Sequence, residues 1–96
     1  MITVKIRTIL TLKKILGKGE VEITVPDRST LGELLTSMVN RWGGELASHL
    51  FEPKGTSVLP SIRLMVNGRD IAFLNRMETV LQNGDKVLLL PLISGG

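Results

Sequence analysis

Residues 87–96 read Val87-Leu88-Leu89-Leu90-Pro91-Leu92-Ile93-Ser94-Gly95-Gly96, an apolar run that leads into two glycines. The run predicts a last strand over Lys86 to Leu90. Its lack of clean alternation indicates a central strand, or one whose outer face is also covered. Glycine has no Cβ, so a Gly-Gly end can enter a channel too narrow for any side chain. We therefore divide the chain into a domain of residues 1–90 and a flexible tail of residues 91–96.

The tail ends in the carboxylate of Gly96. This carboxylate is either the reactive group of the protein or part of a frayed chain end, since termini are commonly poorly ordered. Fully extended, Pro91 to Gly96 spans about 20 Å, at roughly 3.3–3.6 Å per residue. That length is enough to thread a narrow channel in another protein.

The composition is that of one small globular domain. Apolar residues make up 43% of the 96 residues and charged residues 22%, which excludes a disordered chain. There is no cysteine, so disulfides, thiolate nucleophiles and cysteine zinc sites are excluded together. His49 is the one histidine. We therefore expect no metal site, and an ordinary surface or half-buried histidine.

Charge and hydropathy limit the possible partners. The segment Met1 to Leu10 lacks the continuous apolar stretch of a signal peptide, and no window reaches the length of a membrane span. We expect a cytoplasmic protein with no membrane partner. The net charge is +3, but the twelve Lys and Arg are scattered, and Trp and Phe total three. Without a basic stripe that carries stacking aromatics, we expect no nucleic-acid partner.

Alternation predicts the first two strands. Apolar and polar residues alternate over Ile2–Arg7 and again over Glu20–Val25, the period of a half-buried strand. The connection Thr8 to Gly19 carries lysines and glycines and is typical of a turn-bearing loop. We therefore expect the two strands to form an antiparallel hairpin.

The clearest element is a helix that begins after Thr30. Thr30 and Glu33 have the spacing of a capping box, in which each side chain accepts a hydrogen bond from the other residue's amide. An apolar stripe follows at helical spacing: Leu31, Leu34, Leu35, Met38, Val39 and Trp42. Gly43-Gly44 ends the helix. We expect the stripe to pack on one face of the sheet, with Trp42 at the end of the core.

The rest of the chain predicts a short helix and the second half of the sheet. Glu45 to Glu52 can form a helix that covers one end of the core. Ile62 to Val66 predicts a third strand, which the Asn67-Gly68 turn ends. Ile71 to Leu74 is compatible with a short strand that returns from this turn. Asn83-Gly84-Asp85 forms the turn before the last strand.

These elements predict an α+β fold of order β-β-α-β-β-β, with the last strand beside the first and parallel to it in a mixed sheet. This is the β-grasp arrangement of ubiquitin. The whole chain resembles the prokaryotic sulfur carriers of that class, the small subunit of molybdopterin synthase (MoaD-like) and the thiamine-pathway carrier (ThiS-like). The resemblance rests on Val66-Asn67-Gly68, Leu81-Gln82-Asn83-Gly84-Asp85-Lys86-Val87 and Pro91-Leu92-Ile93-Ser94-Gly95-Gly96.

The resemblance implies a carrier and not an enzyme. A ubiquitin-activating-enzyme-like adenylyltransferase would adenylate the carboxylate of Gly96 with ATP and Mg²⁺, while the carrier itself holds no cofactor tightly. Sulfur would then displace AMP and leave a C-terminal thiocarboxylate, which donates sulfur to a cofactor precursor. Gly95 and Gly96 would supply the reacting atoms. The rest of the tail would lie in the partner's channel: Pro91, Leu92, Ile93 and Ser94.

Several acceptors remain open. Molybdopterin synthesis is the first choice, with the large subunit of the sulfur-accepting synthase as partner. Leu92 stands where molybdopterin-synthase small subunits often carry a second proline. Thiazole and other sulfur-containing products are the alternatives. A protein modifier joined to lysines through Gly96 would use the same tail, and a pure interaction module would not need it.

The strand faces predict a docking surface beside the tail. If Val87 and Leu89 point at the helix, Leu88 and Leu90 point to the opposite side of the sheet. The same reasoning places four more side chains there, so that an apolar centre has a basic margin. We call the full set the outer patch: Met65, Leu88, Leu90, Arg63, Lys5 and Arg7. Adjacent exposed apolar residues of this kind indicate a partner.

Overall fold

The computed structural model describes residues 1–52 and 58–91 of the chain. The strands are β1 (Ile2–Thr8), β2 (Glu20–Val25), β3 (Ile62–Val66), β4 (Arg69–Asp70) and β5 (Lys86–Pro91). The α-helices are α1 (Leu10–Leu16), α2 (Leu31–Trp42) and α3 (Gly44–Leu50), and two single-turn 3₁₀ helices follow β4, η1 (Ile71–Phe73) and η2 (Arg76–Glu78).

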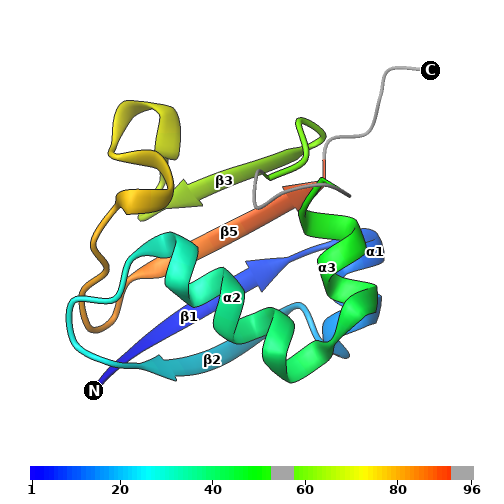
Figure 1. The fold of residues 1–96 in the computed structure, drawn as a ribbon, viewed down its shortest axis with the longest axis horizontal. Helices are drawn as coiled ribbons and strands as arrows, with labels where there is room; N and C mark the ends of the chain where they lie inside the picture. The colour runs from blue at the N-terminus through cyan, green and yellow to red at the C-terminus, as the bar shows by residue number, and fades with distance from the viewer. Residues whose placement is uncertain (53–57, 92–96) are drawn as a thin grey trace.

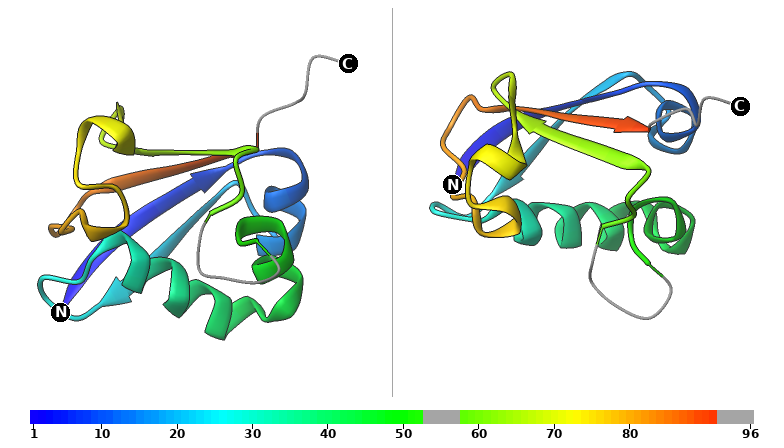
Figure 2. Two further views of the ribbon diagram at one scale, coloured as in Figure 1. Left: turned by 45° about the horizontal axis from the view of Figure 1, so that its top comes forward. Right: turned by 90° about the horizontal axis from the view of Figure 1, so that it is seen from above.

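One mixed sheet carries the fold, with strand order β2-β1-β5-β3-β4 (Figure 1). β1 pairs antiparallel with β2, as the sequence predicts, and β5 lies between a parallel β1 and an antiparallel β3. Helices α2 and α3 cover one face of the sheet (Figure 2). The α+β class and the β-grasp arrangement are therefore confirmed.

The connection between the first two strands differs from the prediction. The segment from Thr8 to Gly19 was expected to be a loop, but β1 extends through Thr8 and α1 follows. Leu12 and Leu16 of α1 are buried in the core, and Gly17 ends the helix at φ 87°, where glycine bears no steric penalty. The i, i+4 spacing of the two leucines was the available signal, hidden by the lysines between them.

Helix α2 is held as its sequence predicts. The amide of Thr30 donates to Glu33 Oε1 at 2.9 Å, and the amide of Glu33 donates to Thr30 Oγ1 at 3.2 Å, which completes the capping box. The first part of the apolar stripe is fully buried, and its end is half-buried against the core. The fully buried members are Leu31, Leu34, Leu35 and Met38, and the half-buried ones are Val39 and Trp42.

Helix α3 begins directly after Gly43, whose φ of 83° turns the chain between the two helices. Leu46 and Leu50 are fully buried, so the predicted cover over one end of the core is confirmed. The chain then returns through a bridge between Phe51 and Val58 to reach β3. Residues 53–57 of this connection lie outside the described part.

The return arm of the third strand is shorter than predicted. The Asn67-Gly68 turn is present, but β4 is only Arg69–Asp70. The expected strand Ile71–Leu74 is wrong, because η1 begins there. The Asp70 carboxylate accepts a bond from the Ala72 amide at 2.9 Å and caps this 3₁₀ turn, which competes with further strand pairing.

Leu34 sits in the middle of the buried stripe and is fully buried. Substitution Leu34→Ala should lower the free energy of unfolding by about 2–5 kcal/mol, as truncation of a core leucine does. Urea unfolding followed by circular dichroism measures this. Asn40→Ala, on the exposed side of the same helix, is the matched control and should change stability by less than about 0.5 kcal/mol. Equal effects of the two variants would mean that the stripe does not form the core.

Candidate functional site

The candidate site begins where β5 ends. The predicted tail started at Pro91, but Pro91 continues β5 and pairs with Ile62 of β3. The strand leaves the sheet between β1 and β3, at the end where β1 leads into α1 (Figure 1). The predicted site residues Leu92, Ile93, Ser94, Gly95 and Gly96 lie outside the described residues.

Thr8 fastens the end of β5 to β1. Its side chain is 2% exposed, and its hydroxyl donates to the Leu89 carbonyl at 2.6 Å. Thr8 is also the register partner of Leu89, two residues before the last described position. Sequence reasoning assigned Thr8 to a loop and missed it. The signal was a polar residue at the next inward position after Ile2, Val4 and Ile6, because a buried hydroxyl needs a partner.

The opposite end of β5 is held by the two turn motifs that carried the family resemblance. Asn67 donates from Nδ2 to Asp85 Oδ1 at 2.9 Å, and the Lys86 amide donates to Asn67 Oδ1 at 2.9 Å. The other oxygen of Asp85 accepts from the Gln82 amide at 2.8 Å. We call this set the turn clamp: Asn67, Gln82, Asp85 and Lys86. It fixes where β5 starts and therefore which side chains face outward.

The six residues of the outer patch share the sheet face opposite α2. Leu88 lies between Arg7 of β1 and Met65 of β3, its register partners on either side. Leu90 is opposite Arg63, and Lys5 is opposite Lys86. Val87 and Leu89 are fully buried on the other face, so the predicted alternation of β5 is confirmed.

The apolar centre of the outer patch is less open than predicted. Met65, Leu88 and Leu90 were expected to be exposed, and each is half-buried. Each lies next to a long basic side chain of a neighbouring strand or of its own strand, Arg7, Arg63 or Lys86, by the sheet register.

The basic margin of the outer patch is partly neutralised. Arg7 lies 3.4 Å from Glu20 Oε1, and Arg63 donates from Nε to Asp70 Oδ2 at 3.0 Å. Such exposed pairs contribute only about 0–1 kcal/mol to stability, but they reduce the local positive potential. Lys86 was left out of the predicted patch. It points outward by the same alternation as Leu88 and adds a cation beside Lys5.

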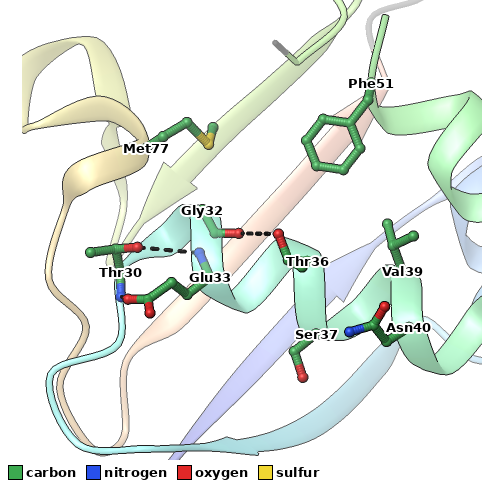
Figure 3. A pocket seen from close by; sticks show the side chains of 9 residues that line it. All are labelled: Thr30, Gly32, Glu33, Thr36, Ser37, Val39, Asn40, Phe51 and Met77. Atoms are coloured by element: carbon green, nitrogen blue, oxygen red, sulfur yellow. Dashed lines mark hydrogen bonds between the residues drawn. The ribbon is translucent and has the colours of Figure 1, made fainter. Parts of the chain in front are cut away.

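A separate groove of about 660 Å³ lies along α2, bounded by η2 and Phe51 (Figure 3). η2 approaches α2 closely at Gly32, where an added Cβ would lie 3.3 Å from the Met77 carbonyl oxygen. The one charged side chain of the lining is Glu33, which is already used in the capping box. Sequence reasoning did not predict this groove, and it does not adjoin the end of β5.

Two further features concern the described ranges 1–52 and 58–91. Those residues contain no cluster of three or more potential metal ligands, and none of their helices is long and apolar enough to cross a membrane. His49 is exposed, and its Nδ1 lies 2.8 Å from the Glu45 carbonyl oxygen, a local contact within α3. The exposed position agrees with the expectation of an ordinary surface histidine.

A comparison with models of protein families identifies the family of this chain. Residues 9–96 match the family model described as the ThiS family. The chain belongs to the ThiS family. The predicted resemblance to ubiquitin-like sulfur carriers is therefore confirmed at the level of the family.

The chain is also similar to individual proteins of known name. The chain is 32% identical over 92 residues to small archaeal modifier protein 3 of Haloferax volcanii, covering 96% of this chain and 97% of that protein. It is 28% identical over 68 residues to the sulfur carrier protein CysO of Mycobacterium tuberculosis, covering 70% and 72%.

Two solved structures share the fold of this ThiS-family chain. The crystal structure of H. volcanii small archaeal modifier protein 1 superposes with a TM-score of 0.83 at 22% identity, over 97% of this chain and 100% of that one. A chain from the Amycolatopsis orientalis BexX/CysO complex gives 0.75 at 22% identity, over 97% and 99%.

Removing the hydroxyl of Thr8 tests whether it fastens the end of β5. Thr8→Val keeps the side-chain shape but leaves the Leu89 carbonyl without this bond, so we expect a loss of about 1–3 kcal/mol in unfolding free energy. Amide exchange measured by NMR should speed up at Leu90 more than at Val87. Thr24→Val removes a hydroxyl from an exposed position on β2 and is the control. Equal exchange rates at Leu90 in the two variants would contradict the assignment.

Proposed function

We propose that this protein is a cytoplasmic sulfur carrier whose Gly96 carboxylate is activated and converted to a thiocarboxylate. The observation that carries the proposal is the match of residues 9–96 to the ThiS family, a range that includes the tail. The course of β5 supports it, because this central strand ends at Pro91, at the end of the sheet where β1 leads into α1.

The chemistry needs an activated carboxylate. An oxygen of the Gly96 carboxylate attacks the α-phosphorus of ATP and displaces pyrophosphate, forming an acyl adenylate. Hydrosulfide then attacks the acyl carbon, the bond to the phosphate oxygen breaks, and AMP leaves. The product is a thiocarboxylate. Its sulfur attacks an electrophilic carbon of the acceptor, and water cleaves the acyl–sulfur bond, which returns the carboxylate.

The partner enzymes supply the catalytic groups in this scheme. An adenylyltransferase holds ATP and Mg²⁺, and the metal neutralises charge on the phosphates as they separate. This division fits a carrier that has no cysteine and, in its described residues, no cluster of potential metal ligands. The carrier contributes the reacting carboxylate and the surface by which the partners recognise it.

The acceptor that we propose is a molybdopterin precursor, with this chain as the small subunit of the synthase. The overall length and the Pro91 to Gly96 sequence favour this choice over the thiazole pathway. Mixing the thiocarboxylate form with purified synthase large subunits for the two pathways would identify the acceptor by the sulfur-containing product that forms.

A second function is favoured by a specific observation. The relative at 32% identity is a small archaeal modifier protein, so the same acyl adenylate could be attacked by a lysine amine instead of hydrosulfide. The product is then an isopeptide bond through Gly96. Both functions use the same tail and the same activating partner, and they differ in the nucleophile that accepts the acyl group.

Sulfur loading can be measured on the intact protein. With its adenylyltransferase, ATP and a sulfide source, the full chain should gain the mass of one oxygen-to-sulfur exchange. Deletion of Gly96 should abolish this gain while the thermal unfolding curve stays unchanged. Deletion of Met1, at the other end, is the control and should load normally. Normal loading without Gly96 would refute the carrier proposal.

Docking is tested at Leu90. Leu90→Asp places a carboxylate in the apolar centre of the outer patch, and desolvating it should weaken binding to both the activating enzyme and the acceptor enzyme by at least about tenfold. Thr24→Asp puts the same charge on the same sheet face, two strands from β5, and should bind normally. Isothermal titration calorimetry measures the affinities, and normal binding of Leu90→Asp would place the docking surface elsewhere.

The nucleophile decides between the two functions. Expression of a tagged chain in its native host, followed by trypsin digestion and mass spectrometry, should yield the thiocarboxylate terminus and no target lysines carrying a C-terminal remnant of this chain. Tagged chain lacking Gly96 is the control for non-specific capture. Recovery of such isopeptide-linked lysines would establish the modifier function.

A further inference from the structure

The outer edge of β3 is covered along only part of its length. β4 pairs with Met65 and Val66 and then ends at Asp70, where η1 begins. Within the described residues, the half of β3 from Ile62 to Leu64 has no strand on that side. Figure 1 shows η1 and η2 standing outside the arrowhead end of β3, while its first half borders no ribbon of the sheet except β5.

Two backbone bonds determine which way the amides of this open half point. The Asn67 amide donates to the Lys86 carbonyl of the β5 turn, and the Ile62 amide donates to Leu59, away from β5. Because successive amides of a strand point to opposite sides, Leu64 directs its N–H to the same side as Ile62. The Leu64 amide therefore points toward the side of β3 that carries η1 and the Val58–Pro60 segment.

A groove of about 340 Å³ runs along this same edge. One wall is the segment Val58–Pro60, the floor is Ile62–Leu64, and the other wall is η1 with Arg76. We call it the β3 groove. Its floor is a paired strand and one wall includes a 3₁₀ turn, so sheet pairing and this turn hold much of the lining in place.

The charge of the β3 groove is positive. Arg63 and Arg76 line it, and the single carboxylate, Asp70, is already bonded to Arg63 and to the Ala72 amide. The Ala72 amide and the Arg63 guanidinium hold the pKa of Asp70 below its usual range, so this carboxylate stays ionised near neutral pH and remains tied to its partners. Arg76 is a second positive charge near Asp70, so the lining carries two arginines and one carboxylate.

An aromatic side chain stands at the end of the groove. Phe73 follows Ala72 of the groove wall and is 86% exposed. Folding gains almost nothing from a phenylalanine left in water, whereas aromatic residues are frequent anchors at protein interfaces. Its place beside a basic groove and an open strand edge favours a protein partner.

We propose that the β3 groove binds an extended acidic segment of a protein partner, which adds to the sheet beside Ile62–Leu64 in line with β4. Main-chain bonds to the strand edge would give the affinity, and Arg76 would select acidic side chains. The proposal does not depend on sulfur transfer, since Arg63 is the one outer-patch residue among the groove's lining.

The test uses the full chain and a fluorescein-labelled peptide, acetyl-Glu-Val-Glu-Val-Glu-amide. Fluorescence anisotropy gives the affinity, and NMR amide exchange gives the location. We expect the peptide to slow exchange of the Leu64 amide and to shift the signals of Ile71 to Arg76. The peptide acetyl-Lys-Val-Lys-Val-Lys-amide should bind at least about tenfold more weakly, because it brings like charges to the arginines.

The chain offers a matched pair of variants. Arg76 and Arg28 are both exposed arginines with positive φ, 51° and 65°, a backbone region that asparagine tolerates well. Arg76→Asn should weaken binding of the acidic peptide by about tenfold, because one charge-assisted hydrogen bond is lost. Arg28→Asn makes the same change away from the groove and should leave binding unaltered.

Three outcomes would overturn the proposal. The first is equal weakening by Arg76→Asn and Arg28→Asn, which would mean attraction by net charge alone. The second is unchanged exchange of the Leu64 amide at saturating peptide, which would mean that no strand is added. The third is an oligothymidine of five nucleotides that binds as tightly as the acidic peptide and shifts the same signals, which would indicate a nucleic-acid ligand.

Discussion

The parallel ladder between β1 and β5 is the interaction on which the rest of the structure depends. It joins the two ends of the chain, and parallel strands cannot be joined by a tight turn, so everything between them has to form the crossover. That crossover contains α2, which buries both strands from one side. The ladder also sets the register of β5. A slip of one residue would turn Leu88 and Leu90 into the core and expose Val87 and Leu89.

The local sequence was sufficient to predict a helix or strand where one strong pattern was present. The Thr30 and Glu33 capping box and the apolar stripe of α2 agree, and alternation alone assigned the faces of β5. The local sequence was insufficient where two weak patterns favoured different structures for the same residues. Helix α1 has two buried leucines among lysines and glycines, and β4 was cut short because the Asp70 side chain caps a 3₁₀ turn. In both places a local signal was present, but a competing local pattern outweighed it in the prediction.

The candidate site could be predicted in part for the same reason. The outer patch follows from strand alternation, so its six residues were found before the structure was known. Strand alternation does not predict which residues are neighbours on adjacent strands, and the structure shows these neighbours. Glu20 and Asp70 come from strands on either side and engage two of the patch arginines, and Thr8 reaches across to Leu89. Each of these depends on which strands become adjacent.

The turn clamp has a consequence for how such sequences are recognised. Its residues lie at the end of β5 opposite Pro91, and their bonds join the two turns to each other and to the start of β5. A β-grasp domain with unrelated chemistry would need the same bonds to start its last strand. The Asn-Gly and Asn-Gly-Asp motifs are therefore signatures of architecture. A genome search based on them would collect scaffolds, and the carriers among these would have to be distinguished by the residues beyond the other end of the strand.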